Sequence, residues 1–454
     1  MIRSIITILS VAVLFFLQAP SHATYETGGV VKETLSNGVT TLVHPEPGSK
    51  VAAVEVFIKV GADDERAANA GIGQLLAGSI LAGTNTVYSV PFARVISDVG
   101  GNLHSVWQWD YLEVYAVTLP QFTGDTISLL ADSIKNSSID PRAIEFSRTA
   151  ILRQAQSESD DPFTCAYTAL RKLIHRGGSY DRSYLGDPAV IRTITRDQVS
   201  DFYQKNVTAS RIVISVVGDV DPNAIRRKVE VCFGGMPWGA GGGLSDRETG
   251  RQGDLGTIKP GEREIRIEKV TSTSFVMVGY PAPRVTDKDY SAMCVANVLL
   301  GGNKSSLLFT EMREKRGLGY QVGSVYPALC GESHIAAYLG LDSSRATPET
   351  LKTVKDTIVA QANLLGSGAF TDADLERAKG YLIGRHALDH ERTRDRAYNL
   401  GLAETLGLGY QNDFLYADAI HKVTRDDVLH VCAKYLHDAA IVILTNPEPT
   451  KTSG

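Results

Sequence analysis

Residues 195–214 have the sequence TRDQVSDFYQKNVTASRIVI, and residues 424–443 have the related sequence TRDDVLHVCAKYLHDAAIVI. At a constant offset of 229 positions, eight of the twenty residues are identical, where unrelated sequences of ordinary composition would share about one. Each copy starts with Thr-Arg-Asp, continues with helical spacing of apolar residues and ends in a β-branched run, which is typical of a capped helix followed by a buried strand. The sequence therefore predicts two duplicated domains.

A glycine-rich segment separates the two copies. Residues 234–258 contain nine glycines in 25 positions and almost no apolar periodicity, which is typical of a linker. We therefore expect a domain at residues 24–233, a linker at 234–258 and a second domain at 259–454.

Both strand and helix patterns occur in each half. Val54, Val56, Ile58 and Val60 alternate with smaller or polar residues, as expected for a strand. Helical stretches are predicted at residues 71–82, 91–99, 122–135, 141–157, 163–175, 287–300, 348–365 and 372–390. The expected fold class is α+β in each half.

Composition excludes several classes of protein. The 454 residues are 43% hydrophobic and 21% charged, which is typical of a globular rather than a disordered chain. With 46 basic and 51 acidic residues and no long basic run, a nucleic-acid partner is not expected. The five cysteines are too few and too scattered for a disulfide framework, and their pairing stays open.

The first 23 residues have the pattern of a secretory signal. Arg3 precedes an apolar stretch at 5–17, and small residues lead to a predicted cleavage after Ala23. The apolar stretch has 13 residues, which is short of the roughly 20 that span a bilayer. We expect a periplasmic or otherwise secreted protein without stable membrane insertion after cleavage.

Two further segments carry a family resemblance. Residues 71–84 (GIGQLLAGSILAGT) resemble the active-site helix of the pitrilysin-type inverted zincins, a family of zinc metallopeptidases, and residues 311–320 (EMREKRGLGY), preceded by LLGG at 299–302, resemble its Arg/Tyr signature. The resemblance covers nearly the whole mature chain. It implies two homologous domains, each with a mainly antiparallel sheet and packed helices, that together form half of a clamshell.

The zinc site of that family is degenerate in this chain. In the family the helix carries H-x-x-E-H, in which two histidines on one helix face bind zinc and the glutamate is the general base. The corresponding residues here are Gln74, Ala77 and Gly78, and the family's distal glutamate falls on Gln154. Because a catalytic zinc needs three protein ligands and an activated water, the resemblance implies no metal in this chain.

The second half carries the Arg/Tyr signature of the family. By resemblance, Arg313 and Tyr320 reach toward a zinc site and hydrogen-bond the carbonyl of a peptide substrate, and His104 and Ser105 stand where the family strand that binds the peptide has Asn-Ala. The chain is similar to the zinc-free subunit of two-chain members, such as the alpha subunit of mitochondrial processing peptidase. The resemblance implies a heterodimer with a homologous H-x-x-E-H subunit that holds zinc, and a chain that is inactive alone.

Two other functions stay open. The fold could serve as a peptide-binding or assembly protein without a peptidase partner. Alternatively, His386 and His390, with Asp389 in the base position, form an H-x-x-D-H motif that could make the chain an independent hydrolase. A third ligand at the family spacing would fall beyond Gly454, so Glu404 or another carboxylate would have to replace it.

Overall fold

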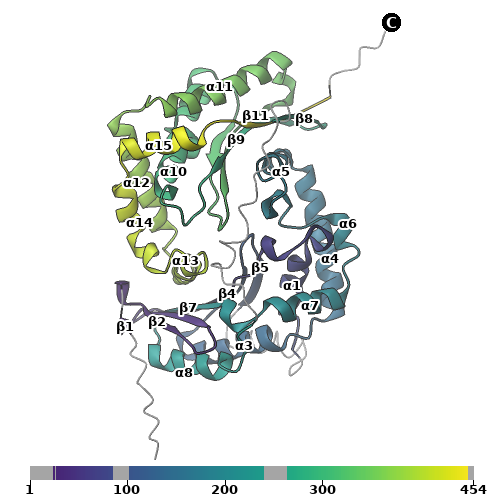
Figure 1. Ribbon diagram of the computed structural model, residues 1–454, viewed down its shortest axis with the longest axis vertical. Helices are drawn as coiled ribbons and strands as arrows, with labels where there is room; N and C mark the ends of the chain where they lie inside the picture. Colours follow the sequence, from purple (N-terminus) through teal and green to yellow (C-terminus); the bar gives the residue numbers. More distant parts are fainter. Residues whose placement is uncertain (1–23, 26, 85–101, 240–262, 448–454) are drawn as a thin grey trace, which may run out of the picture.

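The computed structural model describes residues 24–25, 27–84, 102–239 and 263–447 (Figure 1). The predicted signal at 1–23, the predicted helix at 91–99 and residues 240–258 of the predicted linker lie outside these ranges. Within them, no helix combines the length and apolar character that crossing a membrane requires.

The first half of the chain builds one sheet. Within the described residues it has seven strands in the order β1-β2-β3-β7-β4-β6-β5. The strands are β1 (Thr24–Tyr25), β2 (Val31–Thr34), β3 (Thr40–Pro45), β4 (Ala52–Ile58), β5 (Asn102–Trp107), β6 (Leu112–Thr118) and β7 (Ile212–Gly218). One face of this sheet packs in an apolar cluster against helices of the same half. These helices are α1 (Ile72–Ile80), α3 (Thr123–Asn136), α4 (Pro141–Asp160), α6 (Pro188–Ile191), α7 (Arg196–Asn206) and α8 (Pro222–Phe233).

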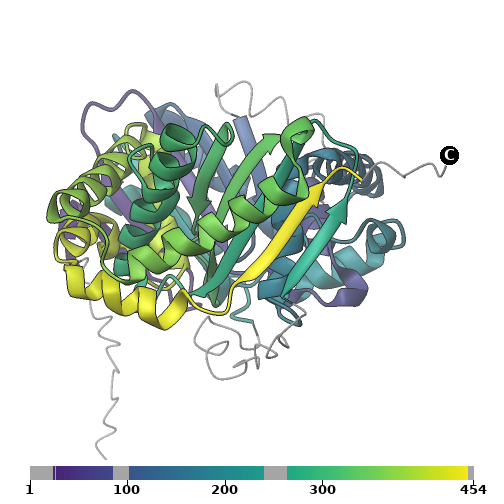
Figure 2. The ribbon, with the colours of Figure 1, turned by 90° about the horizontal axis from the view of Figure 1, so that it is seen from above.

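The second half builds the other sheet. Its five described strands have the order β10-β11-β9-β12-β8. They are β8 (Glu264–Glu268), β9 (Thr273–Ala282), β10 (Gln321–Val325), β11 (Ser333–Asp342) and β12 (Ala440–Thr445). Helices of this half cover one face, and Figure 2 shows the green α11 crossing the strands. They are α10 (Tyr290–Asn297), α11 (Pro348–Gly366), α12 (Asp372–Leu388), α14 (Gln411–His421) and α15 (Arg425–Tyr435).

The repeated sequence forms the same unit twice. Thr195 caps α7 through a capping box with Gln198, and α7 leads to β7 in the middle of the first sheet. Thr424 caps α15 through a capping box with Asp427, and α15 leads to β12 in the second sheet. The predicted α+β class and the predicted capped helix followed by a buried strand are confirmed.

Several predicted helices differ from the observed elements at their C-terminal ends, and the helix predicted at 71–82 ends as α1 at Ile80. The stretch at 287–300 is α10 followed by a π-helical turn at Val298–Gly302, because the Gly301 and Gly302 end of the segment lies against β10. The stretch at 372–390 ends as α12 at Leu388, so that His390 lies in the turn after the helix.

One helix from each half packs on the sheet of the other half, and we call these two the exchanged helices. Helix α5 (Pro162–Ile174) belongs to the first half, but it packs Leu170 against Met277 and other apolar residues of the second sheet. Helix α13 (Thr393–Thr405) belongs to the second half, but it packs Leu400 against Phe57 of the first sheet. In Figure 1 each of these helices lies beside the sheet of the other half. Each sheet is therefore covered on both faces, and the exchanged helices join the halves.

Helix α13 also brings a charge into the first sheet. Arg394 donates from Nε to Oε1 of Glu55 at 3.0 Å and pairs with Glu113, and both carboxylates are buried. Burial and the neighbouring Glu113 raise the pKa of Glu55 well above its usual value, although Arg394 opposes the shift. The guanidinium stacks over the Tyr115 ring at 4.0 Å. The buried carboxyl groups of β4 and β6 are thus paired with an arginine from the other half.

A second polar contact joins the halves near α5. His175 Nε2 lies 2.8 Å from His334 Nδ1, and His334 Nε2 lies 2.7 Å from the Tyr167 hydroxyl. Burial, with a smaller contribution from Arg171, lowers the pKa of His175 to about 4. Burial and the adjacent His175 lower the pKa of His334 well below its usual value. The interface therefore favours two neutral imidazoles.

The neutral His175–His334 pair predicts that the folded protein is less stable in acid. A pKa that is lower in the folded than in the unfolded state gives stability that is fully present above about pH 6.5 and is lost as pH falls toward 4. For His175 the loss between pH 7.5 and pH 5 is about 2 kcal/mol. Urea unfolding at these two pH values should therefore show a smaller loss for His175→Gln than for the wild type. His437→Gln is the matched control, since it makes the same change at an exposed histidine outside the pair. An unchanged pH dependence in His175→Gln would contradict the prediction.

Candidate peptidase-type site

Helix α1 occupies the place predicted for the active-site helix. The apolar side chains of Leu75, Leu76 and Ile80 are fully buried in the first core. The Glu65 carboxylate caps the start of the helix, because it accepts hydrogen bonds from the backbone N–H groups of Gly71 at 3.2 Å and Gly73 at 2.9 Å. Burial raises the pKa of this carboxyl to about 7, although the two backbone hydrogen bonds oppose the shift. The helix is therefore fixed at its start by a buried acid.

Gln74 and Gln154, which stand where the resemblance places zinc ligands, both donate hydrogen bonds to Tyr184. Gln74 Nε2 donates to the backbone oxygen of Tyr184 at 3.2 Å, and Gln154 Nε2 donates to the Tyr184 hydroxyl at 3.2 Å. Glu158 accepts from both the tyrosine hydroxyl, at 2.6 Å, and Gln154, at 3.2 Å. Burial and the hydrogen bond to Glu158 raise the pKa of Tyr184. The structure thus brings Gln74 and Gln154 into one polar cluster.

The position of Gly78 leaves no room for a zinc ligand. A Cβ atom at Gly78 would lie 2.2 Å from Ser147 Oγ and 2.7 Å from Ser147 Cβ, well inside van der Waals contact. Helices α1 and α4 therefore approach each other more closely than a histidine at this position would allow. Ala77 is buried beside it and offers no polar atom in its side chain.

Arg313 and Tyr320 lie together at the other candidate site. Arg313 belongs to a π-helical turn (Phe309–Lys315); its Nη1 donates to the Gly319 backbone oxygen at 2.9 Å, and its guanidinium carbon lies 4.5 Å from the centre of the Tyr320 ring. Tyr320 is 76% exposed and directly precedes β10. The chain can turn between them because Gly317 has φ 61° and Gly319 φ 139°. The two residues form a preformed, accessible pair.

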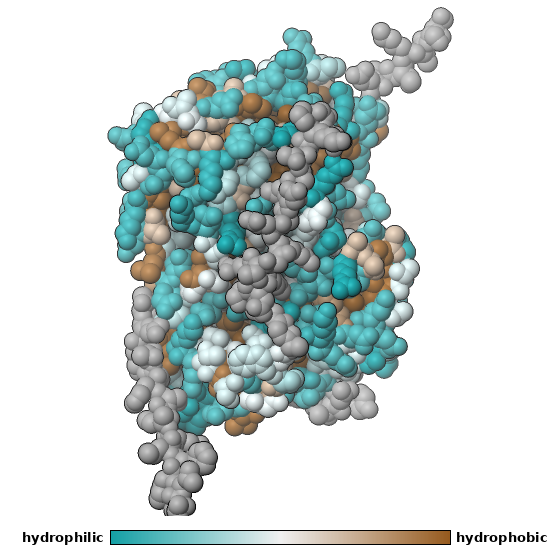
Figure 3. All heavy atoms as spheres, viewed as in Figure 1, coloured by the Kyte–Doolittle hydropathy of each residue, from teal (hydrophilic) through white to brown (hydrophobic). Residues whose placement is uncertain are grey.

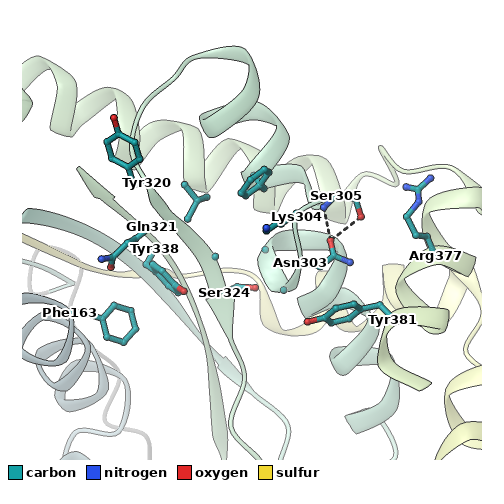
Figure 4. A pocket seen from close by; sticks show the side chains of 15 residues that line it. Phe163, Asn303, Lys304, Ser305, Tyr320, Gln321, Ser324, Tyr338, Arg377 and Tyr381 are labelled. Atoms are coloured by element: carbon teal, nitrogen blue, oxygen red, sulfur yellow. Dashed lines mark hydrogen bonds between the residues drawn. The ribbon is translucent and has the colours of Figure 1, made fainter. Parts of the chain in front are cut away.

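A groove of about 1220 Å³ extends from Tyr320 along β10 (Figure 4). Its walls come from α5, the Gly-Gly turn, β10, β11 and α12. They are lined by Phe163, Gly301, Gly302, Asn303, Lys304, Ser305, Phe309, Tyr320, Gln321, Val322, Gly323, Ser324, Tyr338, Arg377 and Tyr381. Phe163 comes from the exchanged helix and meets Tyr338 edge to face, with ring centres 4.9 Å apart. Because Phe163 belongs to the first half and the other lining residues to the second, the groove is built jointly by both halves.

On the face of the molecule seen in Figure 3, hydrophobic side chains are interspersed among hydrophilic ones.

The predicted peptide-binding strand is β5, the last strand of the first sheet. His104 is exposed and stacks on Tyr115 of β6 with ring centres 4.8 Å apart, and the Ser105 hydroxyl oxygen is buried. Among the contacts of the described residues, none joins this strand or the Gln74 cluster to Arg313 or Tyr320. Within this chain the predicted site residues thus form separate groups.

In the H-x-x-D-H motif at 386–390, the predicted carboxylates do not face the two histidines. Asp389, predicted as its base, pairs with Arg385 at 3.0 Å, and Glu404 pairs with Lys32 at 2.7 Å. Neither of these carboxylates joins the two histidines. Asp413 of α14 lies 2.8 Å from His390 Nε2 instead.

Comparison with known proteins identifies the family. Residues 40–187 match the family described as Insulinase (Peptidase family M16), and residues 193–382 match the Peptidase M16 inactive domain. The chain belongs to the M16, or pitrilysin-like, peptidase family. Among similar proteins, a zinc protease of Streptomyces coelicolor is 29% identical over 415 residues, which cover 90% of this chain and 88% of that protein. The mitochondrial-processing peptidase subunit beta of Lentinula edodes is 25% identical over 409 residues, which cover 89% and 87%.

Two solved structures have the same fold. A protease from Helicobacter pylori superimposes with a TM-score of 0.80 at 20% identity and covers 92% of this chain and 99% of its own. A peptidase M16 inactive domain from Pseudomonas fluorescens gives a TM-score of 0.79 at 18% identity, with coverage of 93% and 99%. The fold is thus shared over nearly the whole described chain. Gln74, Gly78 and Gln154 stand where the resemblance places the zinc ligands of the family.

Sequence reasoning missed several residues of both sites. Glu65, Ser147 and Tyr184 contact the helix that the resemblance assigns to the zinc site, and Phe163 enters the groove from the other half. Gln74 and Tyr184 are 110 positions apart, and no motif relates them. Only the Glu65 position had a local signal, because an acid near a helix start is favourable.

The close approach at Gly78 gives a testable prediction. In an open helix, Gly→Ala adds up to about 1 kcal/mol of stability, whereas overpacking a filled site costs about 1–3 kcal/mol. Gly78→Ala should therefore destabilise the protein in urea unfolding, and Ser147→Gly should remove most of that loss in a double-mutant cycle. Gly384→Ala is the matched control, because a Cβ atom at Gly384 would have nothing within 4 Å, and this variant should be neutral or stabilising. Additive effects of Gly78→Ala and Ser147→Gly would contradict the close contact.

Proposed function

We propose that this chain is the zinc-free subunit of an exported two-chain metalloendopeptidase. The observation that supports it best is the contrast between the two predicted sites. The zinc position is closed by Ser147 and Tyr184, whereas Arg313 and Tyr320 remain paired and accessible beside a groove. A chain with this arrangement can contribute to peptide hydrolysis only at a zinc site supplied by another chain.

Arg313 and Tyr320 have the chemistry to stabilise a developing oxyanion. The guanidinium uses one donor on the Gly319 oxygen, and its fixed fork has other N–H groups for a substrate carbonyl. The tyrosine hydroxyl adds a directed donor. Donors aimed at an oxygen that gains charge in the transition state accelerate the reaction more than they strengthen substrate binding. Their role in this proposal is therefore electrostatic, and neither residue has to exchange a proton.

The groove provides a place for an extended peptide. Strand β10 is the last strand of its sheet among the described strands, and an edge strand can bind a peptide through main-chain hydrogen bonds. Aromatic side chains such as Phe163, Tyr338 and Tyr381 offer apolar contacts that suit varied sequences. Strand β5, which carries His104 and Ser105, lies at the edge of the first sheet. In this proposal it offers the same peptide a second edge strand once the two chains have assembled.

The proposed partner is a homologous chain with an intact H-x-x-E-H helix that binds zinc. Relatives named zinc proteases and a relative named as a processing-peptidase subunit support this assignment. Both chains would be exported, since the first 23 residues of this one have the signal pattern and predict a periplasmic or secreted location. Zinc belongs to the partner in this proposal, and the chain described here is inactive alone.

Reconstitution with the partner tests the proposal. The H-x-x-E-H homologue should cleave an unfolded fluorogenic peptide much faster with this chain than without it. Arg313→Ala or Tyr320→Phe should lower kcat of the pair by about a hundredfold with a smaller change in KM, as expected for loss of an oxyanion donor.

Arg316→Ala is the matched control for this experiment. Arg316 lies in the same segment but pairs with Glu311, so its loss should change kcat little. Equal activity of the homologue with and without this chain would refute the proposal. Full activity of the pair containing Arg313→Ala and Tyr320→Phe would instead assign the chain to a binding or assembly role.

A further inference from the structure

A three-residue cluster lies outside the peptidase-type site, at the end of α12. His386 is in the last turn of α12, His390 follows the helix, and Asp413 lies in the first turn of α14. Asp413 Oδ1 is 3.3 Å from His386 Nε2 and 2.8 Å from His390 Nε2. One ligand atom from each residue lies within 4.8 Å of the other two. The two helices thus direct two imidazole nitrogens and one carboxylate oxygen at a common point.

These spacings suit a small divalent ion. A tetrahedral zinc with bonds of 2.0–2.1 Å places its ligand atoms about 3.3 Å apart. The 3.3 Å between Asp413 Oδ1 and His386 Nε2 matches this value. The 2.8 Å between Asp413 Oδ1 and His390 Nε2 is a hydrogen-bond distance, which would lengthen around an ion. Two imidazoles and one carboxylate are a frequent zinc ligand set, and the fourth position would be taken by water. The side chains are 27%, 18% and 11% exposed for His386, His390 and Asp413, so an ion can enter from solvent.

Surrounding contacts orient the ligands. His390 Nδ1 donates to the His386 backbone oxygen at 2.6 Å, which turns Nε2 toward Asp413. The ring of Tyr416 stacks on His386 with centres 4.5 Å apart and planes 12° apart. A histidine ligand whose other ring nitrogen donates to a carbonyl is a common arrangement in metal sites. The ligand geometry is therefore fixed by contacts outside the cluster.

We propose that His386, His390 and Asp413 bind one divalent transition-metal ion, for which Zn²⁺ is the probe. The ion would cross-link α12 to α14. Helix α14 packs on α13, which covers the first sheet, and Phe414 of α14 lies against Gly28 near the start of the chain. Metal binding therefore stiffens the contact between the halves. This ion is distinct from the catalytic zinc that the proposed function assigns to the partner chain, and it lies outside the Arg313–Tyr320 site.

Metal titration of the purified full chain, stripped with chelator, tests the site. Zinc should bind at one ion per chain in calorimetry and raise the melting temperature, and Co²⁺ should give the visible absorption of a tetrahedral site. Asp413→Asn should weaken binding at least about 100-fold, because loss of an outer-shell partner alone costs about 10- to 100-fold.

Asp389→Asn is the matched control, since it makes the same chemical change inside the H-x-x-D-H motif. Asp389 pairs with Arg385, so its loss should leave metal affinity unchanged. If Asp413→Asn does not fold, His386→Gln serves in its place. The proposal is overturned if the wild type binds no stoichiometric zinc, which would make the cluster an ion pair only, or if the Asp413 and Asp389 variants bind equally well.

Discussion

The exchange of α5 and α13 between the two sheets is the contact on which the rest of the structure depends. Strands β4 and β7 are buried along their whole length, which requires a helix on each face of the sheet. The first half provides helices for one face only, and α13 of the second half covers the other. Since α5 does the same for the second sheet, neither half has a complete core by itself.

This exchange explains where polar residues are buried. Glu55 and Glu113 lie inside the first sheet because Arg394 arrives with α13, and an unpaired carboxylate there would be costly. His175 and His334 meet for the same reason at the other contact between the halves. The exchange also places Phe163 in the wall of the groove beside β10. The proposed peptide site and the stability of the fold therefore share one interface.

The two predicted sites of the family have diverged in different ways. Where the resemblance places the zinc site, Gly78 packs against Ser147 and both glutamines bond to Tyr184. The Arg313–Tyr320 pair is held by its own local turn and does not depend on that helix. One site could therefore close while the other remained accessible. A subunit that works with a zinc-binding partner is consistent with this independence.

The sequence alone predicted the features that repeat locally, although it missed the Glu65 cap of α1 and the π-helical turn at Val298–Gly302. The repeated Thr-Arg-Asp units predicted the capped helices and their strands. Periodicity and capping act over one or two turns, so a local pattern carries their signal. Only the tertiary structure decided that Arg394 bonds to Glu55 from 339 positions away, that Ser147 fills the space at Gly78, and that Asp413 rather than Asp389 faces the two histidines. These contacts arise from the packing of whole helices across both halves, and no local pattern specifies which distant side chain will fill a given space.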